Sequence, residues 1–251
     1  MTLLEAIAVF VAGGAAGAIN VVVGSGTLVT FPVLLAVGYP PLVANVSNTL
    51  GLVPGSLAGA VGYREELRGR GRQVAQFASA SVSGGLLGAV LLLVLPEGAF
   101  EVVVPVLVAL AVVLVAAQPL VSRRVGTPER GGRSARGGPM LLGLIFVTGV
   151  YGGYFGAAQG VLLLGIMGLT LSDSLQELNA IKNVLAGLVN GVAALLFVFV
   201  ADPAWEAVAL IAAGATLGGM LGARVARRLP PMALRGVVVV VGLVAFVQLV
   251  R

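Results

Sequence analysis

The amino-acid sequence predicts an all-α polytopic membrane protein made of two inverted-topology repeats, each with a short broken or re-entrant helix. The chain has 251 residues, of which 59% are hydrophobic and 10% are charged, and its mean hydropathy is +1.08. Its apolar runs recur at lengths that can cross a hydrocarbon layer of roughly 30 Å. A glycine-rich pattern also returns 134 residues after its first occurrence. This composition excludes a soluble enzyme.

Glycine, proline or charged residues bound each apolar run. The runs of the two halves cover residues 3–23, 27–37, 43–61, 74–95 and 100–121, and then residues 140–155, 161–171, 184–200, 207–226 and 234–250. The runs 27–37 and 161–171 are too short to cross alone at a rise of about 1.5 Å per residue. Chain breakers flank the first of them, Gly24-Ser25-Gly26 before it and Gly38-Tyr39-Pro40-Pro41 after it. We expect ten hydrophobic segments, with eight full spans and two re-entrant hairpins as the alternative.

The recurring pattern indicates an internal duplication. Between Gly84 and Pro96, seven of thirteen positions are identical to those 134 residues later. Chance should produce roughly one or two matches in a chain so rich in glycine and leucine. The pattern contains small-xxx-small pairs, for which we expect close helix packing: Gly84 with Gly88, and Gly218 with Gly222.

Basic residues assign the sides of the membrane. They cluster in three places: Arg64, Arg68, Arg70 and Arg72; Arg123, Arg124, Arg130, Arg133 and Arg136; and Arg224, Arg227, Arg228 and Arg235 around Pro230-Pro231. The positive-inside rule places all three in the cytoplasm. The turn at Pro96 is the repeat equivalent of the turn at Pro230, yet it must lie outside, as must the acidic loop 201–203, so the two halves are inverted. We expect a first repeat at 1–121, a basic cytoplasmic linker at 122–138 and a second repeat at 139–251.

The sequence lacks the residues that several kinds of catalytic and metal sites need. The sequence contains no cysteine and no histidine, and the carboxylates stand at loop or segment ends. We therefore expect no catalytic residues, no metal and no cofactor, and the missing phosphate-binding loop indicates that the chain does not hydrolyse ATP. The net charge of +5 orients the chain in the bilayer and does not indicate nucleic-acid binding. An acid at Glu5 predicts that the first apolar run is retained as a span rather than cleaved as a signal.

Polar side chains gather around the two broken regions. On helices, Asn45, Asn48 and Thr49 share one face by their spacing, and so do Asn179, Lys182 and Asn183. The two triads are repeat mates within one residue. They could simply form hydrogen bonds between helices, but their duplication favours a cavity lined by polar side chains. The full set of candidate substrate-binding residues is Asn20, Gly24, Ser25, Gly26, Thr27, Asn45, Asn48, Thr49, Gln159, Gly160, Asn179, Lys182, Asn183 and Asn190.

The helix amino termini at the breaks suit an anion. Gly24-Ser25-Gly26-Thr27 opens the first short run and Gln159-Gly160 opens the second, so that backbone N–H groups and hydroxyls face outward from a partly positive helix end. Lys182 is the sole lysine. It either snorkels to the cytoplasmic surface or points inward, where it would compensate an anionic ligand.

The compound motif resembles the sulfite exporter TauE/SafE family of membrane permeases. Two stretches of the sequence carry the resemblance: Gly17 through Asn20 to Gly24-Ser25-Gly26-Thr27 and Phe31-Pro32, with Asn45 and Asn48-Thr49 following; and residues 149–160 with Leu178-Asn179 and Lys182-Asn183. The resemblance covers essentially the whole chain. It implies about eight helices, no ATPase machinery and the movement of sulfite, sulfonates and related organosulfur anions. Many members carry three glycines where this chain has Gly24-Ser25-Gly26 and Ala158-Gln159-Gly160.

The function expected from these observations is secondary transport of a small anion bound between the two repeats, in a multi-pass protein of the cell membrane. The expected partners are the anionic substrate and the lipid bilayer, and assembly into a homo-oligomer is left open. Two alternatives remain at this point. One is a non-transporting scaffold subunit, suggested by the arginine-rich loops, and the other is a membrane-embedded hydrolase, which has no candidate base or metal ligand.

Overall fold

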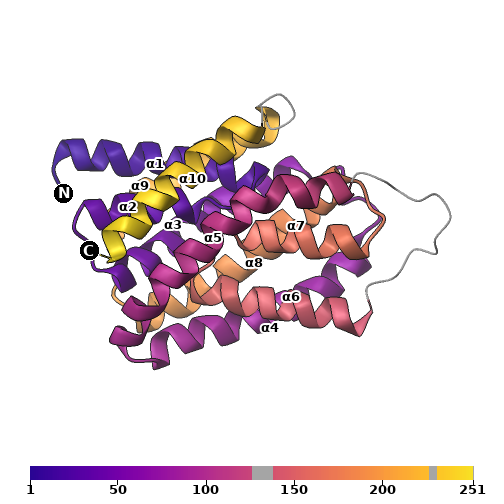
Figure 1. Ribbon diagram of the computed structural model, residues 1–251, viewed down its shortest axis with the longest axis horizontal. Helices are drawn as coiled ribbons and strands as arrows, with labels where there is room; N and C mark the ends of the chain where they lie inside the picture. Colours follow the sequence, from indigo (N-terminus) through magenta and orange to yellow (C-terminus); the bar gives the residue numbers. More distant parts are fainter. Residues whose placement is uncertain (126–137, 226–230, 251) are drawn as a thin grey trace.

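A computed structural model describes residues 1–125, 138–225 and 231–250, and in these residues it contains helices and no strands (Figure 1). The helices are α1 Leu3–Val22, α2 Thr27–Ala36, α3 Pro41–Gly62, α4 Gly71–Val94, α5 Glu97–Val125, α6 Pro139–Tyr154, α7 Gln159–Thr170, α8 Leu175–Val200, α9 Trp205–Val225 and α10 Pro231–Val250. Among the described residues, α1, α4, α5, α8 and α9 are long and apolar enough to cross a membrane. The prediction of a polytopic helical protein is confirmed.

The short helices lie where the apolar pattern predicts them. The helix α2 has 10 residues and α7 has 12, and each follows directly on a helix that ends inside the bundle. The prediction is less accurate for α8, which begins at Leu175 rather than at residue 184. Ser174 and Glu177 form a capping box at this start, and such a box initiates a helix whatever the hydropathy that follows.

The predicted linker is shorter at its start, because α5 continues to Val125. Residues 126–137, with Arg130, Arg133 and Arg136, lie outside the described residues, as do Arg227, Arg228 and Pro230.

Polar contacts identify the two ends of the bundle. At one end the amino group of Met1 lies 3.7 Å from the carboxylate of Glu206, and the backbone N–H of Ala204 donates to the Ser47 hydroxyl at 2.9 Å. The starts of α1, α3 and α9 therefore lie together, at the end that carries the N label in Figure 1. At the other end Arg70, before α4, pairs with Asp173 at 2.7 Å and with Glu177.

Arg70 stays charged because its two acidic partners outweigh the effect of burial on its pKa. Burial lowers the pKa of Arg70, but its hydrogen bonds to Asp173 and Glu177 and their negative charges raise it further, so the net pKa is above its ordinary value. The guanidinium therefore stays charged and ties the α3–α4 connection to the α7–α8 connection.

Glycines hold two helix pairs at close range. The helix α4 packs against α6 and α1 packs against α9. A Cβ at Gly84 or Gly88 would overlap a backbone carbonyl of α6, and one at Gly218 would overlap the carbonyl of Gly14 in α1. At Gly222 it would lie 2.8 Å from the Cα of Ala18. The predicted role of these glycines in close helix packing is confirmed.

Candidate substrate site where the helix breaks meet

Left-handed residues interrupt the chain after α1 and after α6. Gly24 has φ of 86° two residues after α1 ends, and Gly156 has φ of 76° two residues after α6 ends. Ala158, just before α7, has φ of 61° and is the one non-glycine residue with positive φ in the described chain. L-residues avoid this region because Cβ approaches the carbonyl oxygen. Both helices therefore stop inside the bundle, where their last carbonyls have no partner within the helix.

The two breaks touch each other. The N–H of Gly160 donates to the carbonyl of Gly24 at 3.1 Å. A Cβ on either glycine would lie 2.5 Å from the Cα of the other, so only glycine permits this approach. Phe31 of α2 and Phe155 pack edge to face beside the contact, with ring centroids 5.2 Å apart. We call residues 24–26 and 158–160 the break junction.

Side chains of α8 cap the end of α1. The Lys182 ammonium donates to the carbonyls of Asn20 at 3.0 Å and Val21 at 3.1 Å. The amides of Asn179 and Asn183 also donate to the Val21 carbonyl, at 3.1 and 3.3 Å. Lys182 is 0% exposed, so it points inward and does not snorkel. A cation at a helix C-terminus is stabilised by the partial negative charge of the last carbonyls.

A side chain of α3 caps the end of α6 in a similar way. The Asn45 amide donates to the carbonyl of Tyr154 at 3.0 Å, and the Tyr151 hydroxyl donates to the Ala157 carbonyl. Thr49 donates to the Asn45 carbonyl within its own helix at 2.9 Å. Each polar face thus reaches the broken helix of the other half of the chain, and this cross-pairing fastens the halves together.

Asn48 has a different partner. Its amide donates to the Thr27 hydroxyl at 3.2 Å and accepts from the Thr30 hydroxyl, so that it ties α3 to the first turn of α2. Thr30 was not among the candidate residues. It lies one helical turn after Thr27 on the same face, and that spacing is the signal that could have revealed it.

Two of the candidate residues are half-buried, whereas the others are buried. The Asn20 side chain is half-buried and donates to the Ser56 hydroxyl at 3.2 Å, while its backbone carbonyl receives Lys182. Asn190 is half-buried about two helical turns beyond Asn183. The remaining candidates are buried, either in the break junction and the first residue of α2 or on the faces of α3 and α8 that bond to α1, α2 and α6: Gly24, Ser25, Gly26, Thr27, Asn45, Asn48, Thr49, Gln159, Gly160, Asn179, Lys182 and Asn183.

Four buried polar atoms, two in the break junction and two on asparagines that flank it, make no hydrogen bond within the described residues. They are Ser25 Oγ, Gln159 Nε2, Asn45 Oδ1 and Asn179 Oδ1. Each such atom costs about 1–3 kcal/mol. Ser25 and Gln159 are 134 positions apart, and so are Asn45 and Asn179. Polar groups without a hydrogen-bond partner in the described residues therefore stand at positions related by this spacing, and the helix starts at Thr27 and Gln159 have no side-chain cap.

The chemistry available at the junction is hydrogen bonding and charge. Its residues offer hydroxyls, amides, uncapped helix starts and one ammonium. Among the described residues no cluster of three Asp or Glu side chains could hold a metal ion. Such a set of groups can bind a polar or anionic solute without reacting with it.

Comparison with known proteins identifies the family of the chain. Residues 9–249 match the family described as Sulfite exporter TauE/SafE. The chain is 26% identical to the probable membrane transporter protein ORF9 of Sinorhizobium sp, over 96% of this chain and 90% of that protein. It is also 26% identical to a probable membrane transporter protein of Haemophilus influenzae, covering 96% and 92%, and to the probable membrane transporter protein YfcA of Escherichia coli K12, covering 93% and 85%.

No solved structure matches the chain. The family match spans nearly all of the sequence, and the relatives are named as membrane transporters rather than enzymes. The chain is therefore a multi-pass membrane transporter and belongs to the sulfite exporter TauE/SafE family.

Proposed function

We propose that this transporter moves a small oxyanion, namely sulfite, a sulfonate or a related organosulfur anion, and binds it at the break junction. The observation that carries the proposal is a fully buried Lys182 at the end of α1, together with four buried polar atoms of the break junction and its flanking asparagines that make no hydrogen bond within the described residues. Ser25 and Gln159 supply donors for sulfur-bound oxygens, and Lys182 supplies the positive charge. The free amide oxygens of Asn45 and Asn179 accept from a substrate hydroxyl or from water that accompanies the anion.

The energetics favour an anion over a neutral solute. A charge inside a membrane protein is costly unless it is paired, and within the described residues the hydrogen-bond partners of Lys182 are two backbone carbonyls. Backbone carbonyls carry partial negative charges, whereas an oxyanion would bring a full negative charge next to the ammonium. Binding of an anion would therefore lower the free energy of the buried ammonium more than binding of a neutral molecule of the same size.

We infer further that the ten helices form two inverted repeats around this site, at 1–121 and 139–251 with a cytoplasmic linker between them. Helix contacts support the inference, since α1 packs on α9 as α6 packs on α4, and α2 packs on α10 as α7 packs on α5. In such folds a substrate between discontinuous helices reaches each side in turn when one repeat moves against the other. The contact of Gly24 with Gly160 and the Lys182 bonds are then the interactions that must break and reform.

Transport by the purified protein tests the proposal. Liposomes that contain the wild type should take up labelled sulfite or a short sulfonate, with sulfate as a related oxyanion and chloride as the control solute. We expect Lys182→Met to lower uptake about tenfold or more, since charge-assisted hydrogen bonds contribute about 1.5–3 kcal/mol. The variant should still insert, because Asn179 and Asn183 continue to cap Val21.

Two results would contradict the proposal. One is a wild-type protein that neither moves these anions nor gains thermal stability from them. The other is a Lys182→Met variant that transports as well as the wild type, which would leave Lys182 with only a structural role.

A further inference from the structure

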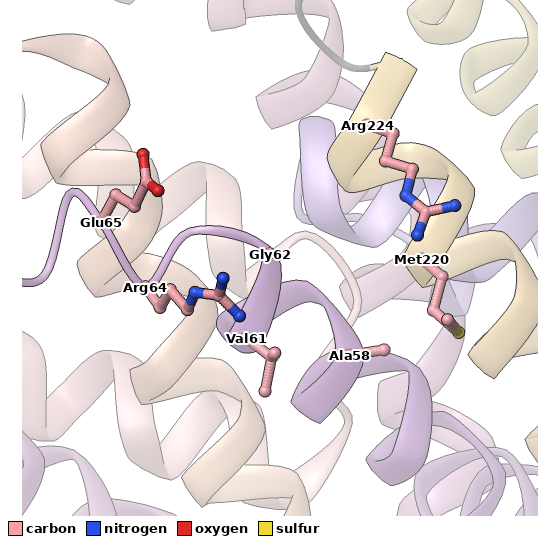
Figure 2. Close-up of a pocket in the computed structure, with 7 residues that line it drawn as sticks. All are labelled: Ala58, Val61, Gly62, Arg64, Glu65, Met220 and Arg224. Atoms are coloured by element: carbon pink, nitrogen blue, oxygen red, sulfur yellow. The ribbon is translucent and has the colours of Figure 1, made fainter.

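A second polar site lies away from the break junction, between the ends of α3 and α9. It is a pocket of about 440 Å³ whose lining includes Ala58, Val61 and Arg64 on one side and Met220 and Arg224 on the other. Figure 2 shows Arg64 just after the end of α3, with Arg224 and Met220 across the pocket on α9. The pocket therefore joins two helices that are far apart in the sequence.

The charges of this pocket are uncompensated. Arg64 and Arg224 are both exposed, and in the described part of the chain neither forms an ion pair. Glu65 also lines the pocket, so the described lining residues carry two guanidiniums and one carboxylate, a net charge of one positive. Guanidinium groups bind phosphate oxygens in a fixed fork geometry. A single negative charge, as on a phosphodiester, matches this pocket better than a doubly charged phosphate monoester.

The surroundings of the pocket are apolar on the side toward the bilayer. Val61 is 62% exposed and Met220 is 46% exposed, and nearby Leu57 and Leu221 are exposed as well. Arg64 and Arg224 belong to the basic clusters that the positive-inside rule places in the cytoplasm. The pocket thus combines cationic groups at headgroup depth with exposed apolar side chains next to them, which suits a molecule that has an anionic head and an acyl tail.

We propose that this pocket binds the headgroup of an anionic glycerophospholipid of the cytoplasmic leaflet, with phosphatidylglycerol as the best match. Its phosphodiester lies between Arg64 and Arg224, and its glycerol hydroxyls donate to Glu65 at the rim. The acyl chains lie along Val61 and Met220. Because α3 carries Asn45 and Asn48 and α9 packs against α1, a lipid that bridges α3 and α9 holds together helices that surround the break junction.

The test compares defined lipids on the purified full-length protein. Thermal unfolding and the lipids retained in native mass spectrometry are measured with phosphatidylglycerol and with phosphatidylcholine of the same acyl chains. We expect the wild type to prefer phosphatidylglycerol about tenfold or more, since each arginine near a membrane surface contributes about 1 kcal/mol. The double variant Arg64→Gln with Arg224→Gln should lose that preference, and Arg224→Lys should keep part of it.

The matched control is Arg68→Gln, which removes an exposed arginine of the same connection that does not line the pocket. It should retain the wild-type preference. Equal retention of the two lipids by the wild type, or an unchanged preference in the double variant, would overturn the proposal. Equal stabilisation by glycerol 1-phosphate or inorganic phosphate at the same concentration would also overturn it, because the pocket would then bind a soluble anion.

Discussion

The two helix breaks have similar backbones but are held by different groups. The end of α1 receives a lysine and two asparagines from α8, whereas the end of α6 receives the amide of Asn45 and, close by, the hydroxyl of Tyr151. The residue 134 positions before Lys182 is Asn48, which is neutral and bonds to α2 instead. The two breaks thus differ in charge, because an ammonium group caps only the end of α1. Two ammonium groups in the same interior would repel each other.

The largest effect is expected where the two breaks touch. Gly24→Ala should destabilise the protein by about 3 kcal/mol or more, because the new methyl meets the Gly160 backbone and the residue must keep a left-handed φ. The measurement is the yield of monodisperse protein and its thermal unfolding midpoint in detergent.

Gly143→Ala serves as the control for this prediction, because Gly143 lies in α6 and a Cβ there would meet nothing within 4 Å. It should leave stability unchanged or raise it by up to about 1 kcal/mol through helix propensity. A Gly24→Ala protein as stable as the Gly143→Ala protein would mean that the breaks do not meet as described.

Substitutions on the polar faces of α3 and α8 should have intermediate and unequal effects on stability. Asn48→Ala removes the shared partner of Thr27 and Thr30 and should cost about 1–3 kcal/mol. Asn183→Ala should cost less, about 0.5–1.5 kcal/mol, because the Val21 carbonyl keeps Asn179 and Lys182. Denaturation of both variants in the same detergent gives the comparison.

Both variants should also bind the transported anion more weakly, if these faces line its site. Equal stability losses would contradict the unequal contacts, and normal transport by both variants would mean that the asparagines only join helices.

Sequence patterns predicted the positions of the helices better than they predicted which residues contact one another. Hydropathy located the short helices α2 and α7, because it is a local signal. The repeated spacing of 134 residues located the glycines at the α4–α6 and α1–α9 contacts. Asn179, Lys182 and Asn183 lowered the hydropathy of α8 and so hid its start, although the capping box of Ser174 and Glu177 was readable. Which carbonyl a donor reaches could not be predicted, since Lys182 and Val21 are brought together only by the packing of the whole chain.

The smallest effect on stability is expected at the unpartnered polar atoms, and it is the most informative about function. Ser25→Ala removes a buried hydroxyl that makes no hydrogen bond in the described structure, so stability should stay the same or rise by up to about 1 kcal/mol. Anion uptake should nevertheless fall several-fold if this hydroxyl donates to the substrate. Thr170→Ala is the matched control, because its hydroxyl is bonded within α7 near the end of that helix, away from the junction. Removal of a group with a purely structural role should lower the stability of the protein and its uptake activity together. A Ser25→Ala protein that keeps full uptake would show that the unmet polar groups at the breaks do not bind the transported anion.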